Sequence, residues 1–141
     1  MDIAYILGLL LFFVHIVAFI AGGANSVVMP IIGAKMATAT PEVRGTLMEI
    51  AQRLTRVGKI AMGTLLVTGI LVLWLKWNFV VPNVWFWVKM AAIVVMIVFI
   101  VLNERAQKAG GPDAPRLGKM YGQLTALSFA VVILSAIFAF N

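Results

Sequence analysis

The feature that most constrains this chain is its first hydrophobic run, residues 3–32, which lies in a stretch without charge between Asp2 and Lys35. A helix that crosses the hydrocarbon of a bilayer needs about 20 predominantly apolar residues. The run therefore predicts a membrane-spanning helix over residues 3–33, which should kink or leave the hydrocarbon near Pro30. Because it lacks a basic start and a small-residue cleavage site, we expect it to be retained rather than removed as a signal peptide.

Three further apolar runs follow, at residues 60–77, 84–102 and 120–140. Hydrophobic residues make up 63% of the chain and charged residues 11%, against about 45–50% and 25% in soluble domains. We therefore predict an all-α fold, an integral membrane four-helix antiparallel bundle that forms a single transmembrane domain over residues 1–141. The absence of cysteine excludes disulfides, thiolate metal sites and covalently attached c-type haem.

The connections between the runs carry recognisable helix starts and stops. Thr40 is a favourable N-cap, Pro41 is a favourable first helical residue, and Glu42 places an acid in the first turn. The apolar stripe that follows predicts a short amphipathic helix between the first two spans, formed by Leu47, Ile50, Ala51 and Leu54. Residues 78–83, with Pro82, should form a short turn, and Gly110-Gly111-Pro112 should end the third helix.

The net charge of +6 is concentrated in two of these connections. The connection between the first and second runs holds Lys35, Arg44, Arg53, Arg56 and Lys59. The connection between the third and fourth runs holds Arg105, Lys108, Arg116 and Lys119. Cations spread over helix ends do not form the patch typical of nucleic-acid binding, so we expect no nucleic-acid partner. By the positive-inside rule the two connections face the cytoplasm and both termini lie outside. We expect the inner (plasma) membrane of a bacterium.

His15 is the only histidine, and it lies well inside the first span. An imidazole in hydrocarbon costs a few kcal/mol unless it finds a partner, so we treat it as a candidate site. At 100° per residue it shares one helix stripe with Gly8, Phe12, Phe19, Gly22 and Ser26. The glycines allow the close approach of either another helix or a flat ligand. Alternatively, His15 is a core residue bonded to a neighbouring threonine or a backbone carbonyl.

Lys89 is the second candidate, because it lies about one and a half turns inside the third span. It either snorkels to the interface beside Trp85 and Trp87, or it pairs with an acidic group or a metal. Methionines inside the spans are possible ligands of haem or copper, although methionine more often fills a core. No carboxylate lies inside a span, which argues against a proton-coupled transporter. No spacing indicates a nucleophile with its base, so the catalytic residues stay unassigned.

Several short motifs resemble those of a known family. They are His15, Ala21-Gly22 and Pro30 in the first span, Met48-Glu49 and Arg53-Leu54-Thr55-Arg56 before the second, and Trp85-Phe86-Trp87-Val88-Lys89 in the third. Together they resemble the HemJ-type protoporphyrinogen IX oxidases, which belong to a group of small four-helix membrane proteins that includes the copper resistance D domain. The resemblance covers most of the chain. Trp87 stands where the family has histidine, and a further family histidine is absent from residues 31–36.

The resemblance implies a haem b held in the bundle, with His15 as an axial ligand and therefore the metal ligand. It implies Lys89 as the other functional position, and the candidate cofactor-binding residues are His15, Phe19, Gly22, Arg56 and Lys89. We predict a haem b-binding membrane protein that acts in electron transfer or tetrapyrrole (protoporphyrinogen) oxidation. The alternatives are a non-catalytic transport or assembly partner with a structural His15, or a copper-handling protein. A bundle of four helices offers little area to enclose haem, so we also expect a homodimer.

Overall fold

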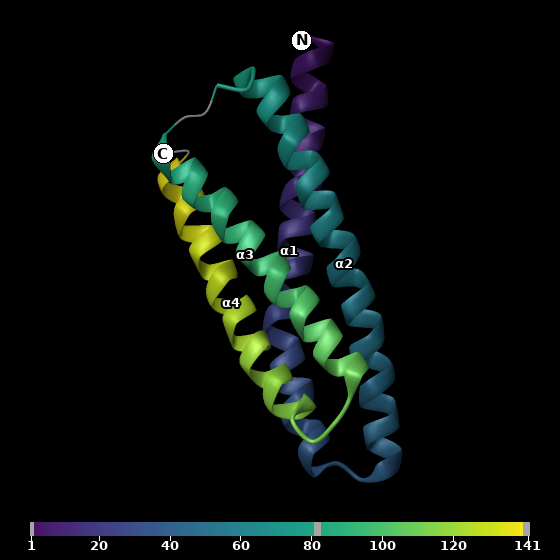
Figure 1. The fold of residues 1–141 in the computed structure, drawn as a ribbon. Coiled ribbons are helices and arrows are strands. Elements are labelled where there is room, and N and C mark those ends of the chain that lie inside the picture. Colours follow the sequence, from purple (N-terminus) through teal and green to yellow (C-terminus); the bar gives the residue numbers. More distant parts are fainter. Residues whose placement is uncertain (1, 81–82, 140–141) are drawn as a thin grey trace. The chain divides into compact units, whose positions relative to one another are not determined.

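A computed structural model describes residues 2–80 and 83–139, and over these residues it is entirely helical, without strands. The four helices are α1 (Ile3–Thr38), α2 (Pro41–Trp77), α3 (Val84–Ala109) and α4 (Ala114–Ala139) (Figure 1). By length and composition each of them can cross a membrane. The prediction of an all-α protein with four long apolar helices is confirmed.

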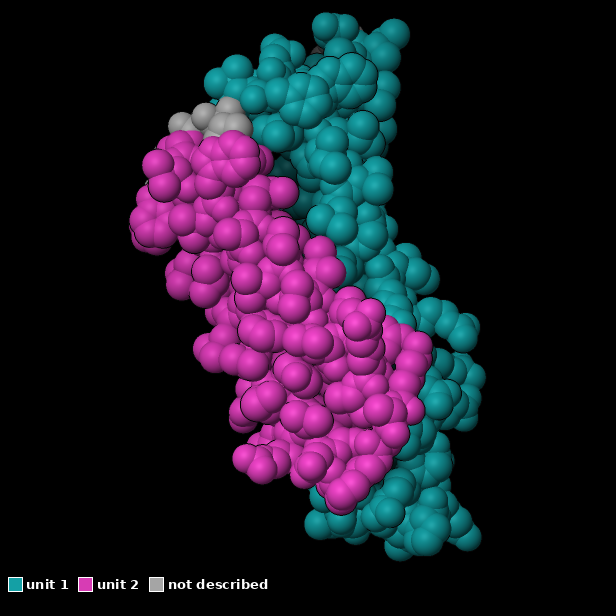
Figure 2. All heavy atoms as spheres, in the orientation of Figure 1, with its two compact units in different colours: residues 1–80 teal, residues 81–141 magenta. Residues whose placement is uncertain are grey.

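The chain divides into two compact units, Met1–Val80 and Val81–Asn141 (Figure 2). In the first unit α1 packs along α2, and in the second α3 packs along α4. A short connection joins the two helices of each unit, so each unit is an antiparallel helical hairpin. The prediction that residues 1–141 form one transmembrane domain stays a prediction.

α2 begins where the sequence indicates. Thr40 is the N-cap, Pro41 occupies the first turn and Glu42 is the acidic residue there, although the Thr40 side chain makes no capping hydrogen bond. The short amphipathic helix does not appear as a separate element, because α2 continues without a break from Pro41 to Trp77. No proline interrupts residues 42–77, so the amphipathic segment and the second span share one ladder of backbone hydrogen bonds.

The other helix ends also depart from the predicted spans. α1 passes through Pro30 and ends at Thr38 rather than at residue 33. α3 continues to Ala109, where Gly110 and Gly111 adopt positive φ angles of 67° and 97°. This confirms the predicted helix stop, since such angles favour glycine. Pro82 in the predicted turn and residue 140 in the predicted fourth span lie outside the described residues.

Candidate functional site

The first unit places His15 of α1 against Thr68 of α2. The His15 Nδ1 atom lies 2.8 Å from Thr68 Oγ1, and 53 residues separate the two in the sequence. Thr68 is 5% exposed, whereas His15 is half-buried. The contact exists because the antiparallel hairpin brings the second half of α2 beside the first half of α1.

The hydrogen bonds of Thr68 fix the direction of its bond to the imidazole. The Thr68 hydroxyl donates its single proton to the backbone oxygen of Thr64, at 2.6 Å. Thr68 Oγ1 can therefore only accept from the ring, so His15 Nδ1 carries a proton and donates it. In the neutral imidazole the lone pair then lies on Nε2, which is the arrangement of a histidine that ligates metal through Nε2.

Gly69, the next residue of α2, lies against the edge of the same ring. A Cβ atom on Gly69 would stand 3.4 Å from His15 Cε1, which is already van der Waals contact. Even an alanine at this position would therefore touch the imidazole. Thr68 and Gly69 together therefore define where the ring lies on the surface of α2.

Gly22 and Phe19 lie on α1 beyond His15. A Cβ atom on Gly22 would meet the Cβ of Ala61 at 4.0 Å, and Ala61 is 5% exposed. Gly22 was expected to allow the close approach of either another helix or a flat ligand. Over the described residues, the structure shows the close approach of α2. Phe19 is half-buried one turn after His15, on the same stripe of the helix.

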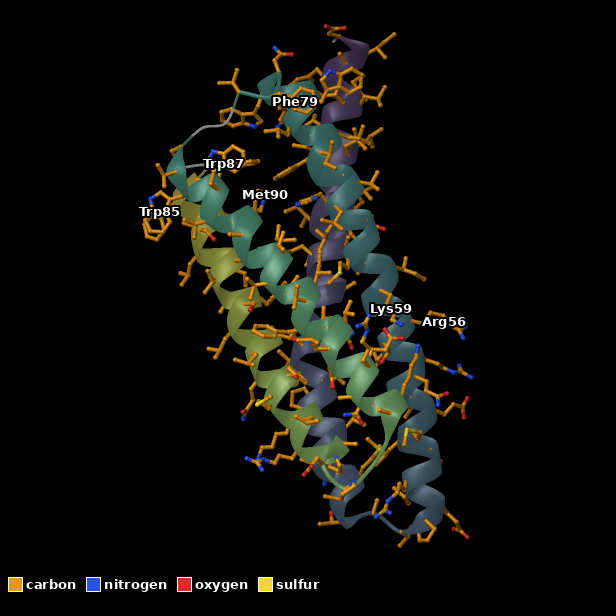
Figure 3. All side chains as sticks on the ribbon, in the orientation of Figure 1. Arg56, Lys59, Phe79, Trp85, Trp87 and Met90 are labelled. Atoms are coloured by element: carbon orange, nitrogen blue, oxygen red, sulfur yellow. The ribbon has the colours of Figure 1, made fainter. Side chains whose placement is uncertain are left out.

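Arg56 is not brought to His15. It precedes Thr68 by 12 residues in α2, which corresponds to about 18 Å along the helix axis. Its side chain is exposed and directed away from α1 (Figure 3). Among the described residues of this unit, no contact therefore supports the prediction that Arg56 binds the same cofactor as His15.

Lys89 belongs to the second unit, where it is half-buried in the second turn of α3. Close to it, Trp85 packs against Phe138 of α4, with 5.0 Å between the ring centroids. Trp87, labelled in Figure 3, is 63% exposed. Its ring makes an edge contact with Phe86. Beyond Lys89 the unit has a shallow apolar groove lined by Val88, Ala91, Ala92, Val95, Ser128 and Val131.

Metal ligation by a cluster of side chains has no basis in the part of the chain that the structure describes. There, no group of three or more His, Cys, Asp or Glu residues is placed to hold a metal ion. Haem makes a smaller demand on the protein, because the porphyrin supplies four ligands and one histidine is a sufficient axial ligand. A site with His15 as its single ligating side chain therefore fits haem better than it fits a bare metal ion.

These features define a class, an α-helical integral membrane protein in which a histidine of one candidate span is hydrogen-bonded to a threonine of the next. No family model, no curated protein and no solved structure matches the chain.

Proposed function

We propose that this chain is a haem b-binding integral membrane protein that acts in electron transfer or in the oxidation of a tetrapyrrole. The observation that supports the proposal is the hydrogen bond from His15 Nδ1 to Thr68. Histidines that ligate metals almost always donate their second ring N–H to an acceptor, which fixes the tautomer and raises the basicity of the ligating nitrogen. Thr68 is such an acceptor for His15.

In this proposal each residue of the first unit has a defined task. His15 offers Nε2 as the axial ligand, and Thr68 holds the proton at Nδ1 and sets the direction of the ring. Gly69 leaves space for the ring edge. Bound haem would supply a redox-active iron in an apolar environment. Lys89 belongs to the second unit and is a separate proposal: a lysine in a span is stabilised by an acidic partner, and a propionate would be such a partner.

A structural role for His15 is the competing hypothesis, and the same bond is compatible with it. A core imidazole also needs a partner in hydrocarbon, and Thr68 provides one. A non-catalytic transport or assembly partner would contain such a histidine. The two hypotheses differ in what Nε2 does, and therefore in the visible spectrum of the protein.

An absorption spectrum of the purified protein, expressed with haem supplementation, separates the two hypotheses. We expect a Soret band, with α and β bands that appear on reduction with dithionite. A featureless visible region would reject the haem proposal and leave the structural histidine. Metal analysis of the same sample that gave stoichiometric copper without iron would also reject it, in favour of copper handling.

We further propose the inner membrane of a bacterium as the location, with both termini outside and the chain as a homodimer. The support for the orientation is the distribution of charge, whereas the homodimer rests on the small area that four helices offer to enclose haem. The α1–α2 and α3–α4 connections and the helix ends beside them carry most of the basic residues, while Lys76 is the cation at the opposite end of α2. Positive residues in short connections favour the cytoplasmic side.

A further inference from the structure

The second helix of each unit contains the same four-residue motif. It reads Arg56-Val57-Gly58-Lys59 in α2 and Arg116-Leu117-Gly118-Lys119 in α4, sixty residues further along. In both helices the motif comes directly before a predicted span, at residues 60–77 and 120–140. A buried hydroxyl follows each glycine by ten residues, Thr68 in α2 and Ser128 in α4.

The contacts of the two glycines show that the motifs occupy equivalent places in the two hairpins. A Cβ atom on Gly58 would overlap the side-chain amide of Asn25, which comes from α1. A Cβ atom on Gly118 would overlap the side-chain amide of Gln107, which comes from α3, and would lie 3.7 Å from Oδ1 of Asn103 on the same helix. In each hairpin, therefore, a side-chain amide of the first helix packs on the motif glycine of the second.

The position of the glycine determines where the two cations point. At 100° per residue, the arginine and the lysine of the motif are three positions apart and share one face of the helix. The arginine lies about 160° around the helix from the glycine, because two residues advance the helix by 200°. Since the glycine faces the partner helix, the arginine faces outward, and Arg56 and Arg116 are both exposed.

The charge of these arginines is not balanced within the described residues. Two other cations are balanced: Arg53 pairs with Glu49 at 2.7 Å in α2, and Lys108 pairs with Glu104 at 3.0 Å in α3. For Arg56 and Arg116 the described residues provide no ion pair and no side-chain hydrogen bond. An outward guanidinium at the beginning of a span lies at the depth of the lipid headgroups.

We propose that each motif binds the phosphate of an anionic phospholipid, so that the chain carries two equivalent lipid sites, one on each hairpin. The guanidinium supplies two parallel N–H donors that match two phosphate oxygens, and the lysine one turn later adds a second cation on the same face. A lipid is favoured over a soluble phosphate because both motifs precede a span directly. The proposal is independent of haem binding.

Native mass spectrometry of the full chain, purified in detergent and mixed with equal amounts of phosphatidylglycerol and phosphatidylcholine, tests this proposal. We expect the wild type to retain up to two phosphatidylglycerol molecules in preference to phosphatidylcholine. Arg56→Gln with Arg116→Gln should weaken retention about fivefold at each site, as expected for one cation lost near a membrane surface. Arg56→Lys with Arg116→Lys should retain most of it.

The matched control is Arg53→Gln with Lys108→Gln. It removes the same number of cations, one from α2 and one from the end of α3, and each of these cations is already paired with a glutamate. Helical content and elution volume should match the wild type in all variants, which excludes loss of fold as the cause. The proposal is overturned if the control variant loses as much lipid as the test variant, or if phosphatidylcholine is retained equally. It is also overturned if inorganic phosphate, added to the lipid-bound protein, displaces the phosphatidylglycerol.

Discussion

Thr68 contributes one hydroxyl to the contact between α1 and α2, and that hydroxyl accepts the Nδ1 proton of His15. Thr68→Val keeps the shape of the side chain but removes the acceptor of the part-buried His15 Nδ1–H. We expect a loss of about 1–3 kcal/mol of stability and, in the haem-loaded protein, a shifted iron reduction potential because the axial ligand becomes less basic. Thr68→Ser, which retains the hydroxyl, is the control. Equal stability and potential in Thr68→Val and wild type would contradict the assigned proton.

Lys89 lies in the other unit, and its proposed partner is a haem propionate. Lys89→Met removes the charge while keeping a long apolar side chain. We expect an unchanged absorption spectrum with weaker haem binding, by about 1.5–3 kcal/mol, since a charge-assisted hydrogen bond is lost. Haem titration followed at the Soret band measures both quantities. A change to a five-coordinate spectrum would instead mean that the lysine amine is itself an iron ligand.

At this scale the sequence predicted part of the site. His15 stands out because it is the only ionisable group deep in the first span, and the hypothesis of a threonine partner could be made from chemistry alone. Which threonine it is could not be predicted, because Thr64 and Thr68 both lie in the second span and only the register of the hairpin distinguishes them. Gly69 was missed for the same reason. Its role depends on a contact across 54 residues.

At the scale of the helices, Gly58 of α2 leaves room for the Asn25 side chain of α1. Gly58→Ala would place a methyl group on the Asn25 amide, which must then move; because that amide is the end of a side chain, we expect a loss of only about 1 kcal/mol, the low end of the cost of overpacking. Gly63→Ala is the matched control on the same helix, because no atom lies within 4 Å of a Cβ there. This control should be neutral or gain up to about 1 kcal/mol from helix propensity. Unfolding in mixed micelles measures both, and a Gly58→Ala variant as stable as the control would contradict the packing.

The four helices were predictable, and so were the start of α2 at Pro41 and the stop of α3 before Gly110. Hydropathy alone did not predict how far the helices extend beyond the spans. Hydropathy identifies the candidate spans, and over the described residues all four predicted spans lie within helices of the structure. It does not identify the helical turns outside the bilayer, so α2 begins 19 residues before the predicted span at residue 60. Backbone hydrogen bonds continue through such a segment wherever no proline stops them. The repeated motif was also missed, since four residues at a separation of sixty gain meaning only from their contacts with Asn25 in α1 and with Gln107 and Asn103 in α3.

At the scale of the whole molecule, the proposed orientation in the membrane rests on the distribution of charge. The chain has no cysteine, so a single cysteine introduced by mutation can be labelled without background from other thiols of the chain. A cysteine at residue 2 should react with a membrane-impermeant maleimide in intact cells, and a cysteine at residue 39 or 112 should react only after lysis. Reaction of residue 39 in intact cells would reverse the proposed topology.

The central claim is that His15 is the axial ligand of a bound haem. The most direct measurement is the haem content and absorption spectrum of His15→Ala, compared with Ile16→Ala, a neighbouring exposed position of α1. His15→Ala removes the only imidazole, and no cysteine can replace it. We predict that haem is lost, or held by a weaker ligand with a shifted Soret band, while Ile16→Ala resembles the wild type. Wild-type haem content and an unchanged spectrum in His15→Ala would show that His15 is a structural residue and that the claim is wrong.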